Sequence, residues 1–278
     1  MTTQRFQRIG IAANLEKAQA VTLLKEIIPS LLSDGFEVFA HDELADCPGT
    51  ESLPKGIPKD VDLVLAIGGD GTILKVARDL VTREVPILGL KGGRLGFLAE
   101  GRTAKVAHWL REGRYHIQKR MRLRATVSGG ESHRTLGALN DVVVHASGYS
   151  RMVSLRVEVD GQLLREVAAD GMIASTPTGS TAYSLSAGGP LLVPTIEAMV
   201  LTPLNPHSLS MRPLVMDGTE QISISVAATR SRIKVTADGQ VGSVLEEDES
   251  ILIERSPYYT CLVVPDDYDF FALLREKL

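Results

Sequence analysis

Few features that mark secreted, membrane or zinc-binding chains occur in this sequence. Its two cysteines, Cys47 and Cys261, are too few for a disulfide framework and form no CxxC pair. The segment Met1–Asn14 is interrupted by two arginines and lacks the apolar core of a signal peptide. The longest uncharged run, 171–196, is rich in Ser, Thr, Gly and Pro, which excludes a membrane span. We therefore expect a cytoplasmic protein with no membrane partner.

No excess of charge and no common nucleotide fingerprint is present either. The net charge of −4 gives no electrostatic reason to expect nucleic acid as a partner. Walker A, GxGxxG and GxSxG motifs are missing, which argues against P-loop enzymes, common dinucleotide folds and α/β hydrolases. With 278 residues, 44% of them hydrophobic, the chain is long enough for two domains with their own cores.

The first part of the chain alternates short apolar segments with amphipathic ones. This order predicts an α/β domain over residues 1–114, built on a doubly wound parallel sheet. The segment 62–67 is almost wholly apolar, as in a parallel strand covered on both faces. We expect strands over 8–13, 36–40, 62–67 and 86–90, and helices over 15–32, 72–81 and 103–111.

Strand patterns dominate from residue 115 onward and predict a β-rich, sandwich-like domain over 115–265. Asp160-Gly161 marks a hairpin turn. The stretch 111–124 alternates basic and apolar residues and is interpreted as a solvated strand face. A helix over 266–278 is expected to pack back on the first domain. The expected strands are 122–127, 139–146, 154–159, 163–168, 221–227, 232–237, 250–255 and 260–264.

Gly68-Gly69-Asp70-Gly71-Thr72 lies between an apolar strand and a helix. Glycines let the backbone approach phosphate oxygens, and the helix N-terminus favours an anion. Thr72 can cap the helix, and Asp70 follows the carboxyl end of a parallel strand, where open α/β sheets bind ligands. The alternative is a plain strand-to-helix turn with a capping aspartate.

The segment 175–190 reads STPTGSTAYSLSAGGP and is dense in hydroxyl groups. Hydroxyls and free backbone groups suit a polar, flat ligand such as a nucleotide. By composition alone, a flexible linker is the alternative. However, residues 171–211 carry only one formal charge, Glu197, so we expect this stretch to be buried under ligand or against another subunit.

Three further groups are ambiguous by themselves. Asn140-Asp141 begins a strand and could bind ribose, although such pairs more often shape turns. Asp238-Gly239-Gln240 is more often a hairpin turn than a site. His207 is interpreted as structural.

Taken in order, these motifs resemble the NAD kinase family (ATP-NAD kinases, bacterial type). The long hydroxyl-rich block is specific to that family and disfavours lipid kinases that share only GGDGT. The matching motifs are GGDGT at 68–72, GRLGFL at 93–98, Asn140-Asp141, TPTGSTAYSLSAGGP at 176–190, PHS at 206–208, RPL at 212–214 and DGQ at 238–240.

The resemblance implies a role for each matching residue. Asp70 would be the general base that accepts the proton of the ribose 2′-hydroxyl. Asn140 would bind adenine and Asp141 the ribose hydroxyls, although the family more often has Glu at that position. Asp170 would contact the nicotinamide end. Further nucleotide-binding residues would be Gly68, Gly69, Gly71, Thr72, Phe97, Arg151, Thr178, Thr181, Ala182, Tyr183, Ser186 and Gln240.

The resemblance also implies substrates and partners. NAD would be the phosphate acceptor and ATP the donor, with Mg²⁺ or another divalent cation carried in on the ATP phosphates and no dedicated metal site in the protein. The chain would form a homotetramer or homodimer. Polyphosphate as donor and NADH as acceptor stay open. From another class, a dinucleotide sensor without catalysis is the alternative, and the intact Asp70 argues against it.

Overall fold

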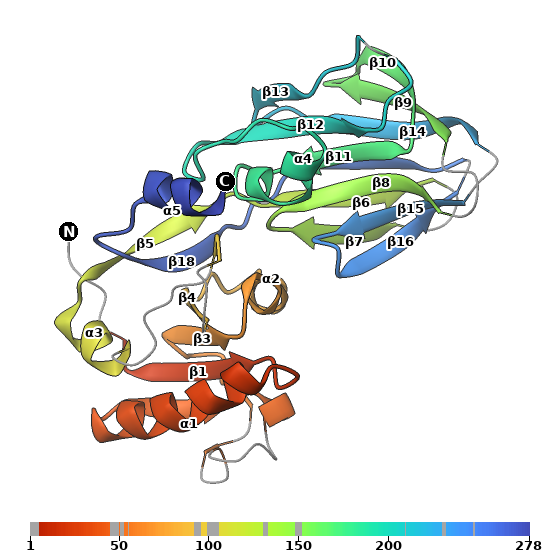
Figure 1. The fold of residues 1–278 in the computed structure, drawn as a ribbon. Helices are drawn as coiled ribbons and strands as arrows, with labels where there is room; N and C mark the ends of the chain where they lie inside the picture. The colour runs from red at the N-terminus through yellow and green to blue at the C-terminus, as the bar shows by residue number, and fades with distance from the viewer. Residues whose placement is uncertain are drawn as a thin grey trace. The chain divides into compact units, whose positions relative to one another are not determined.

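The computed structural model describes residues 6–44, 50, 53–54, 56–91, 96–98, 106–129, 133–147, 152–208, 210–229, 232–246 and 248–278. The chain divides into two compact units, residues 1–119 with 260–278, and residues 120–259 (Figure 1). No helix in the described part of the chain is long and apolar enough to cross a membrane.

The first unit is built on one six-stranded sheet with the order β2-β1-β3-β4-β18-β5. Its pairs β1–β2, β1–β3, β3–β4 and β4–β18 are parallel. The strands are β1 (Arg8–Ala13), β2 (Glu37–Ala40), β3 (Leu63–Ile67), β4 (Ile87–Leu90), β5 (Tyr115–Arg120) and β18 (Thr260–Pro265).

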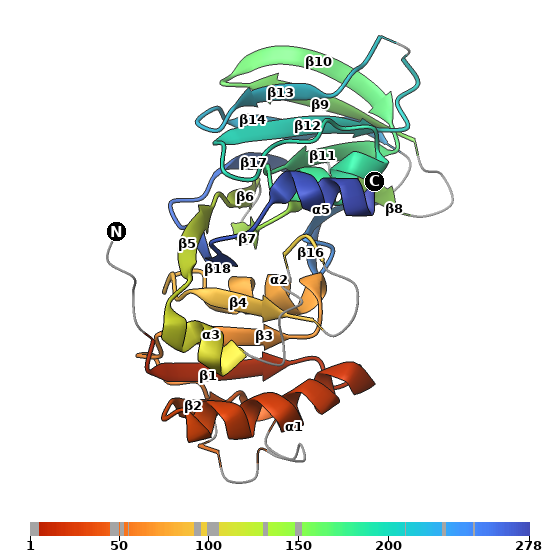
Figure 2. The same ribbon diagram turned by 60° about the vertical axis from the view of Figure 1, so that its left-hand side comes forward.

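Helices cover both faces of this sheet, as a doubly wound fold requires. α1 (Ala18–Ser33) and α3 (Val106–Glu112) share one apolar core with Leu88 and Leu90 of β4. Residue 89 points to the other face, where a Cβ would meet Ile73 of α2 (Asp70–Asp79). The remaining helical segments are η1 (Asp42–Leu44) and α5 (Phe270–Lys277) (Figure 2).

Two strands lie in a different unit from the one predicted. The segments 115–120 and 260–265 were assigned to the β-rich domain, and this is wrong, because both belong to the sheet of the first unit. The chain thus returns near its end to complete the sheet with which it began. The helix expected from residue 15 begins at Ala18, because the Asn14 side chain accepts the Glu16 N–H at 3.0 Å and forms a turn there.

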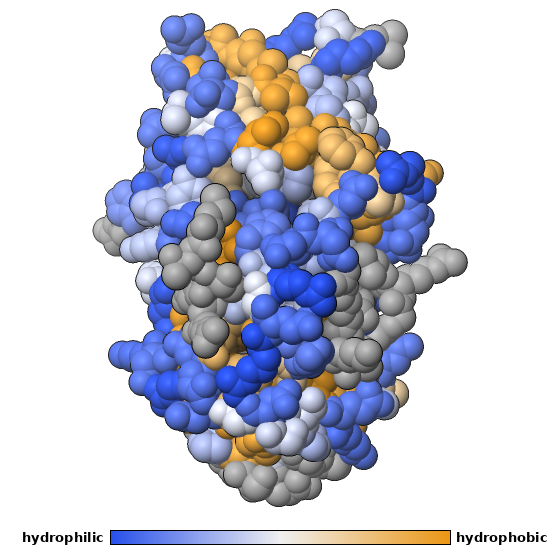
Figure 3. Space-filling view, turned by 90° about the vertical axis from the view of Figure 1, so that its left-hand side faces the viewer, coloured by the Kyte–Doolittle hydropathy of each residue, from blue (hydrophilic) through white to orange (hydrophobic). Residues whose placement is uncertain are grey.

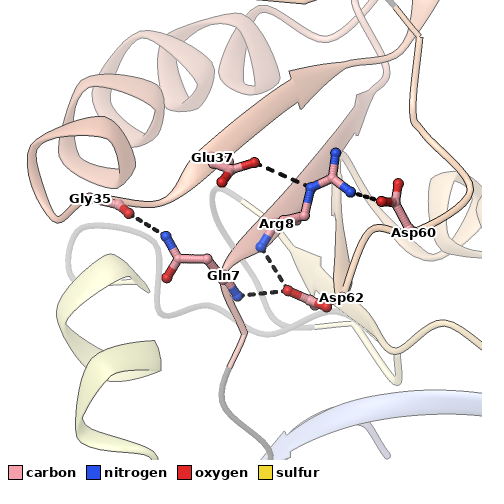
Figure 4. A network of polar contacts seen from close by, with 6 residues as sticks. All are labelled: Gln7, Arg8, Gly35, Glu37, Asp60 and Asp62. Atoms are coloured by element: carbon pink, nitrogen blue, oxygen red, sulfur yellow. Dashed lines mark hydrogen bonds and ion pairs between the residues drawn. The ribbon is translucent and has the colours of Figure 1, made fainter.

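A polar network fixes the amino-terminal end of β1. The Asp62 carboxylate accepts the N–H groups of Gln7 at 2.9 Å and Arg8 at 2.8 Å. The Arg8 guanidinium pairs with Glu37 at 3.2 Å and with Asp60 (Figure 4). These bonds tie β1 to the starts of β2 and β3, so the carboxyl ends of the three strands are held in register at the opposite edge.

The second unit consists of two six-stranded antiparallel sheets around one apolar core, which is a β-sandwich. One sheet has the order β10-β9-β14-β17-β6-β7, with β10 (Gln162–Ala169), β9 (Val153–Val159), β14 (Ile222–Thr229), β17 (Ser250–Arg255), β6 (Leu123–Ser128) and β7 (Arg134–Ala138). The other has the order β13-β12-β11-β8-β15-β16, with β13 (Leu214–Asp217), β12 (Ala198–Leu204), β11 (Gly171–Ser175), β8 (Asp141–Ser147), β15 (Arg232–Ala237) and β16 (Val241–Leu245).

Two local predictions in this unit have opposite outcomes. The hairpin at Asp160-Gly161 is confirmed, with φ of 48° and 75° at the two turn residues that join β9 to β10. The solvated basic face over 111–124 is wrong in part, because Arg120 and Arg122 are only 3% and 1% exposed. A buried guanidinium needs a carboxylate nearby, and Arg122 lies in the field of Asp238.

Candidate functional site

The glycine-rich turn connects β3 to α2 in the first unit. A Cβ on Gly68 would collide with the Thr72 hydroxyl and lie 3.2 Å from the Asn14 Cβ, so this position requires glycine. The helix begins at Asp70 with Gly69 as its N-cap, and no side chain caps it. The predicted cap at Thr72 is therefore wrong, since this residue lies inside the first helical turn.

The Asp70 carboxylate is held by a separate segment of the chain. One oxygen accepts the Phe97 N–H at 3.2 Å, and the other accepts the Leu98 N–H at 3.4 Å. A Cβ on Gly96 would strike the same carboxylate. The reading of Asp70 as a plain helix cap is therefore wrong, because the side chain is aimed at residues 96–98 and remains partly exposed. This arrangement fixes the orientation of a carboxylate beside the glycine turn.

The second unit has a cavity of about 690 Å³ on the outer face of the β13-to-β16 sheet. Its wall contains five predicted site residues, Asn140, Asp141, Asp170, Ala182 and Tyr183. The volume lies within the range of nucleotide and drug-sized sites. The other lining residues are Val143, His145, Ala146, Leu204, Asn205, Thr236, Asp238 and Gly239.

Strand periodicity explains which residues reach this cavity. Val142 and Val144 of β8 point into the sandwich core, so Asp141, Val143 and His145 alternate onto the outer face. Asp170 precedes β11, and its carboxylate accepts a hydrogen bond from the Asn205 amide at 2.8 Å. Asp170 and Asn205 therefore form one polar side of the cavity.

Asp141 and Asp238 form a buried acidic pair in the cavity wall. The Asp238 carboxylate accepts the N–H groups of Leu139, Asn140 and Asp141 at 2.9, 2.7 and 3.3 Å. Asp141 is only 5% exposed, and burial, followed by repulsion from Asp238, raises its pKa from 3.8 to about 7. Burial also raises the pKa of Asp238, but the three N–H groups and Arg122 oppose that shift. The three N–H groups and Arg122 therefore favour the negative charge on Asp238 over Asp141.

Most hydroxyls of the 175–190 segment are used within the protein. Thr176 donates to the Leu139 carbonyl at 2.6 Å, and Ser180 donates to the Pro177 carbonyl at 2.7 Å. A Cβ on Gly179 would collide with the Asn140 backbone. These contacts seat the segment against Asn140-Asp141, so the flexible-linker alternative is wrong. The segment includes η2 (Gly179–Thr181) and α4 (Tyr183–Ser186).

The burial expected for 171–211 is found in its strands and in residues 176–180, but not along the rest of the connection between the strands. β11 and β12 are buried throughout, whereas the connection between them exposes large apolar side chains. Tyr183 is 49% exposed at the cavity wall. The exposed aliphatic residues of the connection are Leu191, Val193 and Ile196.

Several predicted residues do not line this cavity. Thr178 is buried, and its hydroxyl has no hydrogen-bond partner among the described residues. Thr181 donates to the Thr178 carbonyl at 3.0 Å, and Ser186 is exposed at the end of α4. Gln240 ends the hairpin turn between β15 and β16, where its N–H donates to the Ala237 carbonyl. Arg151 lies outside the described residues.

Sequence reasoning missed His145, Asn205 and the carboxylate of Asp238. His145 could have been found from its alternation with Asp141 on one strand. Asn205 has no sequence signal of its own beside His207. His207 is exposed and donates its backbone N–H to the Ala168 carbonyl. Within the described ranges, no group of three or more His, Cys, Asp or Glu side chains is placed to hold a metal ion.

The first unit has a glycine-rich turn beside an oriented carboxylate, and the second has a cavity of about 690 Å³. These features are typical of a nucleotide-dependent phosphotransferase. The model of the ATP-NAD kinase N-terminal domain matches residues 9–113, and that of the ATP-NAD kinase C-terminal domain matches residues 139–264. The chain belongs to the NAD kinase family.

Full-length relatives and solved structures agree with this assignment. The chain is 41% identical to the NAD kinase of Moorella thermoacetica, covering 98% of this chain and 89% of the relative. It is 39% identical to that of Geotalea daltonii, covering 98% of each. Yeast NADH kinase complexed with NADH superposes with a TM-score of 0.87 at 26% identity, over 98% of this chain and 86% of that one. An NAD kinase from Archaeoglobus fulgidus in complex with ATP gives 0.75 at 25% identity, over 98% of each chain.

Proposed function

We propose that this NAD kinase transfers the γ-phosphoryl group of ATP to the 2′-hydroxyl of the adenosine ribose of NAD, producing NADP and ADP, with Asp70 as the general base. The proposal rests on the family matches over residues 9–113 and 139–264 together with the oriented Asp70 carboxylate beside the glycine turn. We place this activity in the cytoplasm, where the buried Cys261 stays a free thiol.

NAD is proposed to occupy the cavity of the second unit. Asn140 offers an amide for the adenine edge, and Asp141 offers a carboxyl group for ribose hydroxyls. The half-exposed Tyr183 ring provides a face on which a base can stack. Asp170, oriented by Asn205, is proposed to bind the carboxamide end of the dinucleotide. All four residues line one cavity within a single chain.

The chemical step requires mainly that the reacting groups be aligned and that a base be positioned beside the hydroxyl. A ribose hydroxyl is a poor nucleophile, and phosphoryl transfer depends on fixing the reacting groups and neutralising charge. The hydrogen bonds from Phe97 and Leu98 hold the Asp70 carboxylate in one orientation, from which it can accept the hydroxyl proton. Gly68 and Gly69 leave backbone space for phosphate oxygens beside it.

A divalent cation such as Mg²⁺ is proposed to arrive with the ATP phosphates. Mg²⁺ keeps several waters and commonly takes only one or two protein carboxylates together with substrate phosphates. The described residues offer no group of three or more His, Cys, Asp or Glu side chains for such a cation, so the ATP phosphates and water are proposed as its main ligands. When bound, the cation neutralises phosphate charge.

Purified protein incubated with NAD, ATP and MgCl₂ tests the activity. We expect NADP to form in proportion to ADP, as measured by an NADP-specific dehydrogenase assay. NADH replaces NAD and inorganic polyphosphate replaces ATP in parallel reactions, which defines the acceptor and the donor. Ligand binding without NADP formation would indicate a sensor instead, and phosphorylation of a lipid but not of NAD would indicate a lipid kinase.

We also propose that the chain works as a homodimer or homotetramer. β10 and β13 each form one edge of their sheet, and each exposes two large aliphatic side chains. Unprotected apolar edges favour pairing with another chain. Figure 3 shows a patch of hydrophobic residues on the upper part of the side of the molecule that it presents. The edge-strand residues are Leu163, Leu164, Leu214 and Val215.

Light scattering coupled to gel filtration tests the assembly. Leu214→Lys combined with Val215→Glu should reduce the mass toward that of one 30.0 kDa chain. Phe271→Lys is the matched control, because Phe271 is 60% exposed but belongs to the first unit. A monomeric wild type, or an edge double variant that keeps the wild-type mass, would contradict this assembly.

A further inference from the structure

Asp238 binds the start of β8 from the hairpin turn between β15 and β16. Its Oδ2 accepts the Leu139 N–H at 2.9 Å, and its Oδ1 accepts the N–H groups of Asn140 and Asp141 at 2.7 and 3.3 Å. The backbone N–H of Asp238 in turn donates to the Asp141 carbonyl at 2.9 Å. Both oxygens of this one carboxylate are therefore occupied by the amides of three successive residues.

The carbonyl groups of the same three residues are bound as well. Thr176 donates its hydroxyl to the Leu139 carbonyl at 2.6 Å and its N–H to the Asn140 carbonyl at 2.8 Å. The segment 139–141 is thus held by Asp238 at its N–H groups and mainly by Thr176 at its carbonyl groups. A backbone bound through both kinds of group is fixed in one orientation, which sets the directions of the Asn140 and Asp141 side chains.

Arg122 supplies the charge that balances the Asp238 carboxylate. It is only 1% exposed, and its Nη2 lies 3.5 Å from the point that a Cβ on Gly137 of β7 would occupy. Burial lowers the pKa of Arg122, and the charge of Asp238 raises it. Burial raises the pKa of Asp238, and its three N–H partners and then the Arg122 charge lower it. The two opposite charges therefore stabilise each other.

We propose that Asp238, with the charge of Arg122, is the positioning residue of the dinucleotide site and holds residues 139–141 so that Asn140 and Asp141 face NAD. Both side chains line the cavity of the second unit. The role requires two oxygens that only accept hydrogen bonds, as those of a carboxylate do. This inference rests on the proposed kinase activity, which supplies NAD as the occupant of the cavity.

Asp238→Asn tests this role and leaves the turn intact. Asp238 and Gly239 have φ of 53° and 63°, and Asn-Gly adopts such a turn as readily as Asp-Gly. In either orientation, however, the amide places its NH2 group against at least one N–H of residues 139–141. We expect the KM for NAD to rise at least about tenfold, while the KM for ATP stays within about twofold. An unchanged KM for NAD, or an equal rise in both KM values, would overturn the proposal.

Asp160→Asn is the matched control, because Asp160-Gly161 is a second Asp-Gly hairpin turn with positive φ at both residues. The Asp160 Oδ1 accepts the N–H of Gln221 at 2.8 Å, and an amide oxygen can accept the same hydrogen bond. We expect both KM values of this variant to equal those of the wild type. A rise in the KM for NAD as large as that of Asp238→Asn would show that the effect is not specific to the dinucleotide site.

Variants of Arg122 separate its charge from its packing. Arg122→Lys keeps the charge and Arg122→Met removes it, so we expect the methionine variant to raise the KM for NAD several-fold and the lysine variant to raise it less. In the Asp238→Asn background, Arg122→Met should add less than about twofold, because the charge has lost its partner. Equal effects of Arg122→Met in both backgrounds would overturn the part assigned to Arg122.

Calorimetric titration with NAD separates this proposal from the proposed activity. If the wild type forms NADP but Asp238→Asn keeps the wild-type affinity for NAD, the positioning role is wrong and the kinase activity stands. If the wild type binds NAD but forms no NADP, the proposed function fails, and a weakened affinity in Asp238→Asn still supports the positioning role.

Discussion

The Asp238 carboxylate holds the backbone of Asp141 and repels its side chain. It accepts the Asp141 N–H at 3.3 Å, and its charge adds to the burial that raises the Asp141 pKa to about 7. The neutral form of Asp141 can donate as well as accept a hydrogen bond, whereas the charged form only accepts. The protonation state of a predicted ribose-binding group therefore changes near neutral pH.

The raised pKa of Asp141 makes the free energy of unfolding fall as pH rises from about 4 to about 7. Asp141 keeps its proton up to about pH 7 in the folded state and loses it near pH 3.8 when unfolded, so the folded state binds more protons between these values. The shift corresponds to on the order of 4 kcal/mol of unfolding free energy, lost between about pH 4 and pH 7. Asp141→Asn stays neutral, so the variant should gain stability relative to wild type across that window. Urea unfolding at several pH values measures the difference, and a difference independent of pH would refute the shifted pKa.

Asp141→Ala should weaken NAD binding more than it slows the chemical step. A ribose hydrogen bond exists before and during transfer, and leaving a ribose hydroxyl without its buried partner costs about 1–3 kcal/mol. We expect the KM for NAD to rise by roughly 5- to 150-fold, with kcat changed only a few-fold. Steady-state titration with NAD provides both numbers. An unchanged KM for NAD with a strongly lowered kcat would indicate that Asp141 acts in the chemical step and not in NAD binding.

NAD should protect the amides of residues 181–186 from hydrogen exchange. Ala182 and Tyr183 line the cavity of the second unit, and the segment is already seated against Asn140 through Thr176 and Gly179. Ligand contact should therefore slow exchange in a segment that is partly exposed in the free protein. Mass spectrometry with and without saturating NAD measures this. Equal exchange in both samples would remove this segment from the dinucleotide site.

Gly96→Ala should lower kcat without unfolding the protein. Its Cβ would strike the Asp70 carboxylate, which must then turn away from Phe97 and Leu98. Displacement of a general base by about 1 Å can cost about a hundredfold in rate. Gly137→Ala is the control, since its Cβ has only an ordinary contact at 3.5 Å with Arg122. Normal turnover in Gly96→Ala would show that the orientation of Asp70 is not needed.

Local patterns were enough to predict the glycine-rich turn between β3 and α2, the Asp160-Gly161 hairpin and the division into α/β and β-rich parts. They could not show that β18 completes the first sheet, because strand partners far apart in sequence leave no local signal. Asp141 and Asp238 are 97 residues apart and meet only through the pairing of β8 with β15. The hydroxyl-rich segment was recognisable, but composition could not tell hydroxyls that bind ligand from those, such as Thr176, that bind the backbone.

Asp70→Asn tests the central claim most directly. The amide keeps the size of the side chain and can retain one of the two hydrogen bonds from residues 97 and 98, so the fold should survive. It cannot accept the ribose proton, and loss of a general base costs about 10²–10⁴-fold in rate. Glu26→Gln, an exposed substitution of the same kind on α1, controls for the loss of one charge.

The measurement is the turnover number at saturating NAD and ATP, beside calorimetric binding of each substrate. We predict that both affinities stay within a few-fold of wild type while turnover falls at least about a hundredfold. Near-normal turnover by Asp70→Asn would contradict the assignment of Asp70 as the catalytic base.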